Sequence, residues 1–267
     1  GATGGVALYQ SNGSGPIVLF APADVDTINS AGGDITITGT ASAADAIGVY
    51  SYGVDLIGGA GDVTVDGSSP LGVGILLANG AGIGTTTGAI TLIGEGANFG
   101  LDIADGAIDT DSGDISLTGD ALAAGATAGV RVAGGGLSTN GGSIAVTGSS
   151  AGGVGVQLGD GGAFAIDSNG GAISIDGTGV TAGVSMQGNT VDSGGGAIDV
   201  AGIASGAGAI GVDLTDARLI GTSGDGSNAR PRGATLDAFT AAAVPFGRPG
   251  RVDEIAAGIV WLASDES

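Results

Sequence analysis

Four aspartates in one short stretch are the strongest candidate for chemistry in this sequence: Asp102, Asp105, Asp109 and Asp111. Calcium binds several oxygen ligands, which carboxylates supply. The alternative is an acidic outer surface that keeps a glycine-rich protein soluble, and it also accounts for Asp34, Asp62 and Asp114 elsewhere. Because the calcium-binding glycine-rich nonapeptide is absent, we expect no metal site and keep the four residues only as a weak calcium candidate.

The residue types exclude several other chemistries. The chain has no His, no Cys and no Lys, so histidine-based triads, thiol nucleophiles and disulfides are ruled out. Its net charge of −21 argues against nucleic-acid binding, which needs a basic face. No run of 18 apolar residues is present, so we expect no membrane span.

Paired carboxylates on a repeat scaffold suggest a carbohydrate-active enzyme as one alternative. A lyase also needs a basic residue, and residues 1–216 contain only Arg131, which we interpret as an outward residue between two valines. Aromatic residues, which usually line sugar clefts, make up 3% of the chain, and we interpret Tyr50 and Tyr52 as a surface cluster. We therefore assign no catalytic residue and expect no cofactor.

The element that must position these residues is a repeat of seven copies, spaced 25 to 29 residues apart. Each copy starts and ends with glycine and alternates apolar with polar residues between them, which places its two apolar side chains on one face. A fixed period of this length is typical of a repeat architecture. The copies occupy residues 33–39, 61–67, 88–94, 113–119, 142–148, 171–177 and 196–202.

Each repeat contains two further strand-like pieces. One reads Gly-apolar-x-apolar and begins at Gly74, Gly100, Gly129, Gly155, Gly183 and Gly211, with a weaker copy at Gly48. The other is a single apolar residue five positions before the next copy: Ile28, Leu56, Ile83, Ile108, Leu137, Ile166 and Val191. Outward threonines, Thr36/Thr38 and Thr85–Thr87, suggest a regular hydroxyl face, but we expect them not to align from coil to coil.

Three short strands per repeat predict an all-β fold, a parallel β-helix of about seven coils of ~27 residues. Strands about 4.8 Å apart make this a rod of roughly 34 Å, with stacked Ile, Val and Leu inside. The glycine clusters at residues 58–61, 140–142, 169–171 and 194–196 are expected to supply positive φ at the corners. We assign residues 1–32 to an incomplete first coil and residues 33–216 to the repeats.

The strings GGDITITGTASA, TDSGDISLTGDA and TTTGAITLIG resemble the repeats of filamentous-haemagglutinin-like adhesins, over about residues 17–216. These are large exported bacterial proteins, so the resemblance implies a right-handed β-helix, export or a cell-surface location, and a stalk or adhesive role. It carries over no functional residue. No signal is expected within this sequence, which reads as a fragment.

The last part of the chain changes in character. Residues 1–216 hold 21 of the 27 acidic residues and one of the six arginines, whereas the remaining residues are nearly neutral. We interpret residues 217–234 as a junction and residues 235–267 as a short α-helical tail. Apolar residues at Val252, Ile255, Ile259 and Leu262 have the spacing of an amphipathic helix.

This tail, VPFGRPGRVDEIAAGIVWLASDES, resembles the C-terminal segment of short-chain dehydrogenases/reductases. The matching positions are Gly247, Arg248, residues 254–256 and residues 262–265. The family's catalytic Tyr-x-x-x-Lys is absent because the chain has no Lys, and its cofactor loop fails at Val154. The repeats and the tail resemble unrelated families, and two origins stay open for their occurrence in one chain: a genuine fusion, or an erroneous joining of two reading frames or DNA fragments.

Three hypotheses for function follow. The first is a structural or adhesive stalk fragment of an exported bacterial surface protein, without catalysis, whose host or cell-surface ligand is a carbohydrate or protein receptor. The second is a truncated or chimeric dehydrogenase-type oxidoreductase, inactive as it stands. The third is a carbohydrate-active β-helix enzyme.

Overall fold

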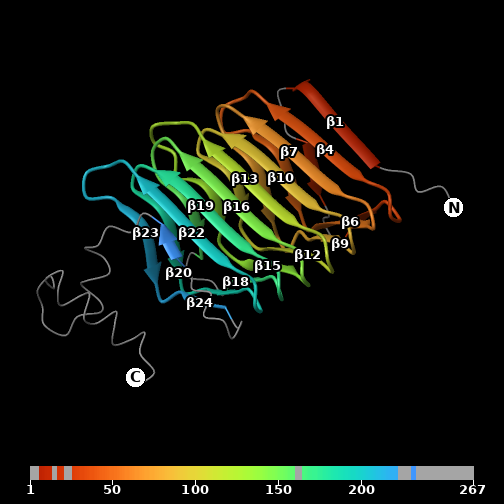
Figure 1. The fold of residues 1–267 in the computed structure, drawn as a ribbon. Coiled ribbons are helices and arrows are strands. Elements are labelled where there is room, and N and C mark those ends of the chain that lie inside the picture. Colours follow the sequence, from red (N-terminus) through yellow and green to blue (C-terminus); the bar gives the residue numbers. More distant parts are fainter. Residues whose placement is uncertain (1–5, 14–16, 21–25, 160–163, 222–229, 233–267) are drawn as a thin grey trace, which may run out of the picture.

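The protein is a parallel β-helix, seen in a computed structural model of the 267-residue chain (Figure 1). The structure describes residues 6–13, 17–20, 26–159, 164–221 and 230–232. Within these residues the secondary structure is all β, and every pair of neighbouring strands is parallel. The fold class predicted from the repeat, with about seven coils and three strands per coil, is therefore confirmed.

Successive strands of the chain enter three sheets in turn, so each strand pairs with its equivalents in the coils before and after it. Sheet A contains β1 (Val6–Gly13), β4 (Ile35–Ala41), β7 (Val63–Ser69), β10 (Ile90–Gly96), β13 (Ile115–Ala121), β16 (Ile144–Ser150), β19 (Ile173–Gly179), β22 (Ile198–Ala204) and β25 (Arg230–Arg232).

Sheets B and C complete each coil. Sheet B contains β2 (Ile17–Phe20), β5 (Ile47–Tyr52), β8 (Val73–Ala78), β11 (Phe99–Ile103), β14 (Ala128–Val132), β17 (Val154–Leu158), β20 (Ala182–Gln187) and β23 (Ile210–Thr215). Sheet C contains β3 (Asp26–Asn29), β6 (Val54–Gly59), β9 (Ile83–Thr85), β12 (Gly106–Thr110), β15 (Gly135–Thr139), β18 (Phe164–Asp167), β21 (Thr190–Asp192) and β24 (Arg218–Ile220).

The three sequence pieces supply the three sheets. The glycine-bounded copies form sheet A, where Ile90 pairs with Ile115 and Ile115 with Ile144. The Gly-apolar-x-apolar pieces form sheet B, and the single apolar residues lie in sheet C, where Ile83, Ile108 and Leu137 are in register. Each sheet A strand continues two residues beyond the closing glycine of its copy, as Ile35–Ala41 does beyond Gly39.

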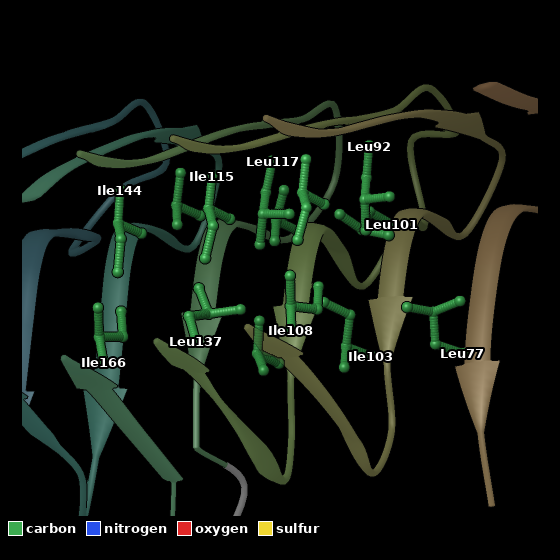
Figure 2. Close-up of a cluster of buried hydrophobic side chains, with 14 of the residues drawn as sticks. Leu77, Leu92, Leu101, Ile103, Ile108, Ile115, Leu117, Leu137, Ile144 and Ile166 are labelled. Atoms are coloured by element: carbon green, nitrogen blue, oxygen red, sulfur yellow. The ribbon is translucent and has the colours of Figure 1, made fainter. Parts of the chain in front are cut away.

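The interior is a continuous stack of aliphatic side chains along the rod (Figure 2). Leu92, Leu117, Leu101, Ile103 and Ile108 all have no exposed surface. Burying such a side chain stabilises the fold by about 1.5–3 kcal/mol, and the same layers recur in coil after coil. Ile28, in the coil nearest the N-terminus, is only partly buried but packs against the same core.

Many glycines are required for close approach between sheets rather than for positive φ. The closing glycine of each sheet A copy faces the glycine of sheet B, and a Cβ on Gly119 would overlap the carbonyl oxygen of Gly129. We call these two stacked columns the glycine seam. The corner prediction is confirmed at Gly59, Gly141, Gly170, Gly194 and Gly195, which have positive φ.

The last glycines of those four clusters, residues 61, 142, 171 and 196, have ordinary φ. A Cβ on any of them would instead overlap the backbone of the equivalent glycine one coil earlier. These positions therefore need glycine because neighbouring coils approach closely there, which the sequence analysis did not anticipate.

The described strands reach beyond the repeat boundaries expected from the sequence. Strands β1, β2 and β3, from residues 1–32, contribute one strand to each sheet. Strands β24 and β25 lie past residue 216 and pair with β21 and β22. The expected helix at residues 235–267 lies outside the described residues. Within the described ranges, no helix has the length and hydropathy needed to cross a bilayer.

Candidate functional site

The structure does not gather the four aspartates of the weak calcium candidate. Asp102 lies in β11 of sheet B and Asp109 in β12 of sheet C, while Asp105 lies in the turn between these strands and Asp111 follows β12. Across the described parts of the chain, no group of three or more acidic residues is placed to hold a metal ion. The proximity of these residues in sequence reflects one coil running from one face to the next.

Asp102 instead forms an ion pair with Arg131, its register partner in the next coil. The Nε and Nη2 atoms of Arg131 donate to the two carboxylate oxygens of Asp102, each at 2.9 Å. The guanidinium also lies 4.8 Å from the centroid of the Phe99 ring. A bidentate pair of this kind compensates the burial of the carboxylate, which is only 5% exposed as a residue.

Arg131 thus points outward between Val130 and Val132, as the sequence indicated, but with two partners that the sequence analysis missed. The signal was available: Asp102 lies 29 residues before Arg131, which is one coil. Residues one repeat apart are neighbours in a β-helix, whereas residues seven apart lie on different sheets.

A second set of aspartates joins consecutive coils. Asp34 accepts a hydrogen bond from the backbone N–H of Asp62 at 3.0 Å, and Asp62 accepts one from Ala89 at 2.8 Å. Asp114 accepts from both the backbone N–H (2.7 Å) and the hydroxyl (2.8 Å) of Ser143. These carboxylates are exposed, as expected for an acidic surface, but they also bond the corner of the next coil.

The environment moves the pKa values of the Asp114 and Asp109 carboxyls in opposite directions. The hydrogen bonds from Ser143 to the carboxylate of Asp114 lower its pKa, since they favour the charged form. Partial burial raises the pKa of Asp109, and the negative charges of Asp111 and Asp55 add to that rise.

The outer face of sheet A carries mainly hydroxyl and acidic residues. One column aligns Thr36, Thr64, Thr91 and Ser116 in register, so the expectation that threonines do not align is wrong for this column. The neighbouring column is interrupted as expected, because Thr38 is followed by Asp66 and Ile93.

Thr85 was predicted to point outward, and this is also wrong. Its residue is 6% exposed, and its hydroxyl donates to the carbonyl of Gly88 at 2.6 Å. Thr85 follows Ile83 by two residues, and a period of two places both side chains on the inner face.

The outer face of sheet B differs in kind. Its central outward positions form a register column that we call the sheet B face: Tyr50, Leu76, Asp102, Arg131, Gln157, Ser185 and Asp213. The rings of Tyr50 and Tyr52 meet edge to face, with centroids 5.9 Å apart. Burial raises the pKa of Tyr50, with a further contribution from Tyr52. This face combines aromatic, aliphatic and ion-paired groups and is the strongest candidate for a binding surface.

Comparison of the chain with protein-family models, curated proteins and solved structures gives no match. The resemblances to adhesin repeats and to a dehydrogenase C-terminus therefore rest on the quoted residues alone.

Proposed function

We propose that this chain is a structural or adhesive stalk segment of an exported bacterial surface protein, and that it performs no catalysis. The observation that supports this proposal is the uninterrupted aliphatic interior, which is compatible with such a role. A rod built in this way holds its outer faces at fixed positions over its whole length, because each coil is bonded to the next.

The chemistry of the polar residues is consistent with this proposal. Asp34, Asp62 and Asp114 accept hydrogen bonds from the following coil, and Asp102 is paired with Arg131. These side chains contribute to the stability of the rod, and the proposal requires no cofactor.

The proposed partner is a carbohydrate or protein receptor on a host or bacterial cell. The acidic balance of the chain disfavours a nucleic acid as partner. For a surface adhesin, the outer faces of the sheets are the regions available to a receptor, because the interior is filled.

Location can be tested with antibodies raised against the purified chain. We expect them to label intact cells of the source organism without permeabilisation, with a cytoplasmic protein as the negative control. Labelling that requires permeabilisation would contradict export. In parallel, beads coated with the chain should adhere to cells more than beads coated with the heat-denatured chain, and equal adhesion would contradict a folded adhesive surface.

A further inference from the structure

Sheet B presents a nearly neutral face on a strongly acidic rod. In the eight strands of sheet B the charged residues are Asp102 and Arg131, which form an ion pair, and Asp213 in the last strand, β23. Five strands of sheet A each carry one acidic residue: Asp66, Glu95, Asp120, Asp176 and Asp199. The sheet B face is therefore the one side of the rod on which two acidic molecules can approach without strong repulsion.

Apolar groups continue this neutral face toward the corner between sheets A and B. Leu71, just before β8, is 55% exposed, and Leu122, in the turn that precedes β14, is 52% exposed. Tyr50, Leu76 and Phe99 are half-buried within the sheet. The two leucines thus add exposed apolar surface along the edge of sheet B.

We infer that the sheet B face binds a second copy of this chain, so that two rods pair side by side. A basic partner would be drawn to the acidic faces of sheets A and C, and a partner with an acidic contact surface would find no free basic face on sheet B, where Arg131 is bonded to Asp102. A second copy meets neither objection, because a twofold axis places the same neutral face on both sides of the contact and turns the acidic faces outward.

The size of the face is sufficient for such a pair. The eight strands of sheet B have four to six residues each, and their seven steps give a face of about 34 Å by about 18 Å. Two such faces bury roughly 1,200 Å², which is the lower bound for a specific, stable interface. Contact at Leu71 and Leu122 adds to this area. Flat sheets pack face to face about 10 Å apart, which the small and medium side chains of this column allow.

Sedimentation equilibrium of the full chain tests this inference without reference to adhesion or export. We expect a mass of twice 24.6 kDa at micromolar to hundred-micromolar concentration. The dimer should tighten between about 0.1 M and about 1 M NaCl, because the Debye length falls from about 10 Å to about 3 Å and screens the repulsion between acidic rods. A monomer at all concentrations, or a dimer that dissociates in salt, would overturn the inference.

Matched acidic substitutions locate the contact. Leu76→Asp places a charge on the sheet B face and should raise the dimer dissociation constant by about tenfold or more. Ile93→Asp adds the same charge at an exposed position of sheet A and should leave dimerisation within about twofold of the wild type, since a substitution away from the contact has little effect on binding. Equal effects of the two variants would place the contact elsewhere, for example at the ends of the rod.

A thiol footprint keeps the inference testable if Leu76→Asp folds poorly. The chain has no cysteine, so Gln157→Cys on sheet B and Thr147→Cys on sheet A of the same coil each provide a single thiol. Maleimide modification of Gln157→Cys should slow as the protein concentration rises, whereas that of Thr147→Cys should not. Concentration-independent rates at both positions would contradict pairing through sheet B, as would a monomer that binds a neutral polysaccharide at this face.

Discussion

Sheets A and B have matching inner faces and contrasting outer faces. Inside, both present Ile, Val and Leu in every coil, as Leu92 and Leu101 show in one coil and Leu117 and Val130 in the next. Outside, sheet A carries hydroxyl and acidic groups, whereas sheet B carries tyrosines, a leucine and a single ion pair. The repeat therefore fixes the inner positions for stability, while the outer positions differ and are where specificity can arise.

The largest effect is expected where the two sheets meet, at the glycine seam. Gly119→Ala would place a Cβ against the backbone of Gly129, which cannot move aside by changing a rotamer. We expect a loss of about 3 kcal/mol or more in the free energy of unfolding, measured by urea denaturation. Gly125→Ala, which has open space around the new Cβ and no positive φ, is the control and should be neutral or slightly stabilising. Similar losses of unfolding free energy in both variants would contradict the claim that the glycine seam is needed for the close approach of sheets A and B.

The next effect concerns the ion pair of the sheet B face. Arg131→Met leaves the Asp102 carboxylate buried without its partner and should cost about 2–3 kcal/mol, at the low end for a buried pair because the guanidinium is partly exposed. The double variant Asp102→Leu/Arg131→Met should recover most of this loss. Asp120→Asn on sheet A should change stability by less than about 0.5 kcal/mol. A loss at Asp120 as large as that at Arg131 would remove the contrast between the faces.

Asn189 differs from buried polar residues of sheet C, such as Thr85, whose hydroxyl is hydrogen-bonded. Asn189 is 2% exposed, and neither atom of its amide has a hydrogen-bond partner within the described structure. It lies one coil after Phe164, just before the pair formed by Ala165 and Thr190. Asn189→Leu should therefore raise the free energy of unfolding by about 1 kcal/mol, because a desolvated amide is removed. A destabilised variant would show that the amide has a partner, such as a buried water.

The smallest effects concern two exposed carboxyls and differ in sign. The lowered pKa of Asp114 means that its charge stabilises the fold above its unfolded-state pKa, and this contribution is lost as the pH falls through the folded-state pKa. Asp114→Asn should thus lower the melting temperature at pH 7 but not at the lowest pH at which the chain stays folded.

For Asp109 the pKa is raised, so its charge destabilises the fold at neutral pH, and this cost disappears on protonation. Asp109→Asn should therefore raise the melting temperature slightly at pH 7, and the gain should vanish below the ordinary carboxyl range. Thermal melts of both variants from pH 7 to pH 3 provide the measurement. Melting-temperature shifts of the same sign for the two variants at pH 7 would contradict the opposite pKa shifts of Asp114 and Asp109.

The fold could be predicted from the sequence because its signals are local and repeated. Alternation places Ile35 and Ile37 on one face, and the recurrence of this pattern shows that equivalent strands stack in register. The glycine seam could not be read in the same way. The requirement at Gly39 arises from the backbone at Gly48, and only the packing of two sheets shows that a Cβ has no room there.

The candidate site was less accessible to prediction because its contacts run across coils. Asp102 was grouped with Asp109, its neighbour in sequence, although its partner is Arg131 in the next coil. The aligned column of Thr36, Thr64 and Thr91 also emerges only between coils, beside a column that Asp66 interrupts. Comparing each outer residue with those one repeat away would have found both.

The central claim, that equivalent residues stack in register from coil to coil, can be tested by one distance. Thr38 and Asp176 lie in the same column of sheet A and are separated by five strand pairings. Spin labels at Thr38→Cys and Asp176→Cys, diluted with unlabelled chain, should give a narrow pulsed-EPR distance distribution centred near 24 Å, from about 4.8 Å per strand. A broad distribution, or one centred well beyond 35 Å, would contradict the β-helix.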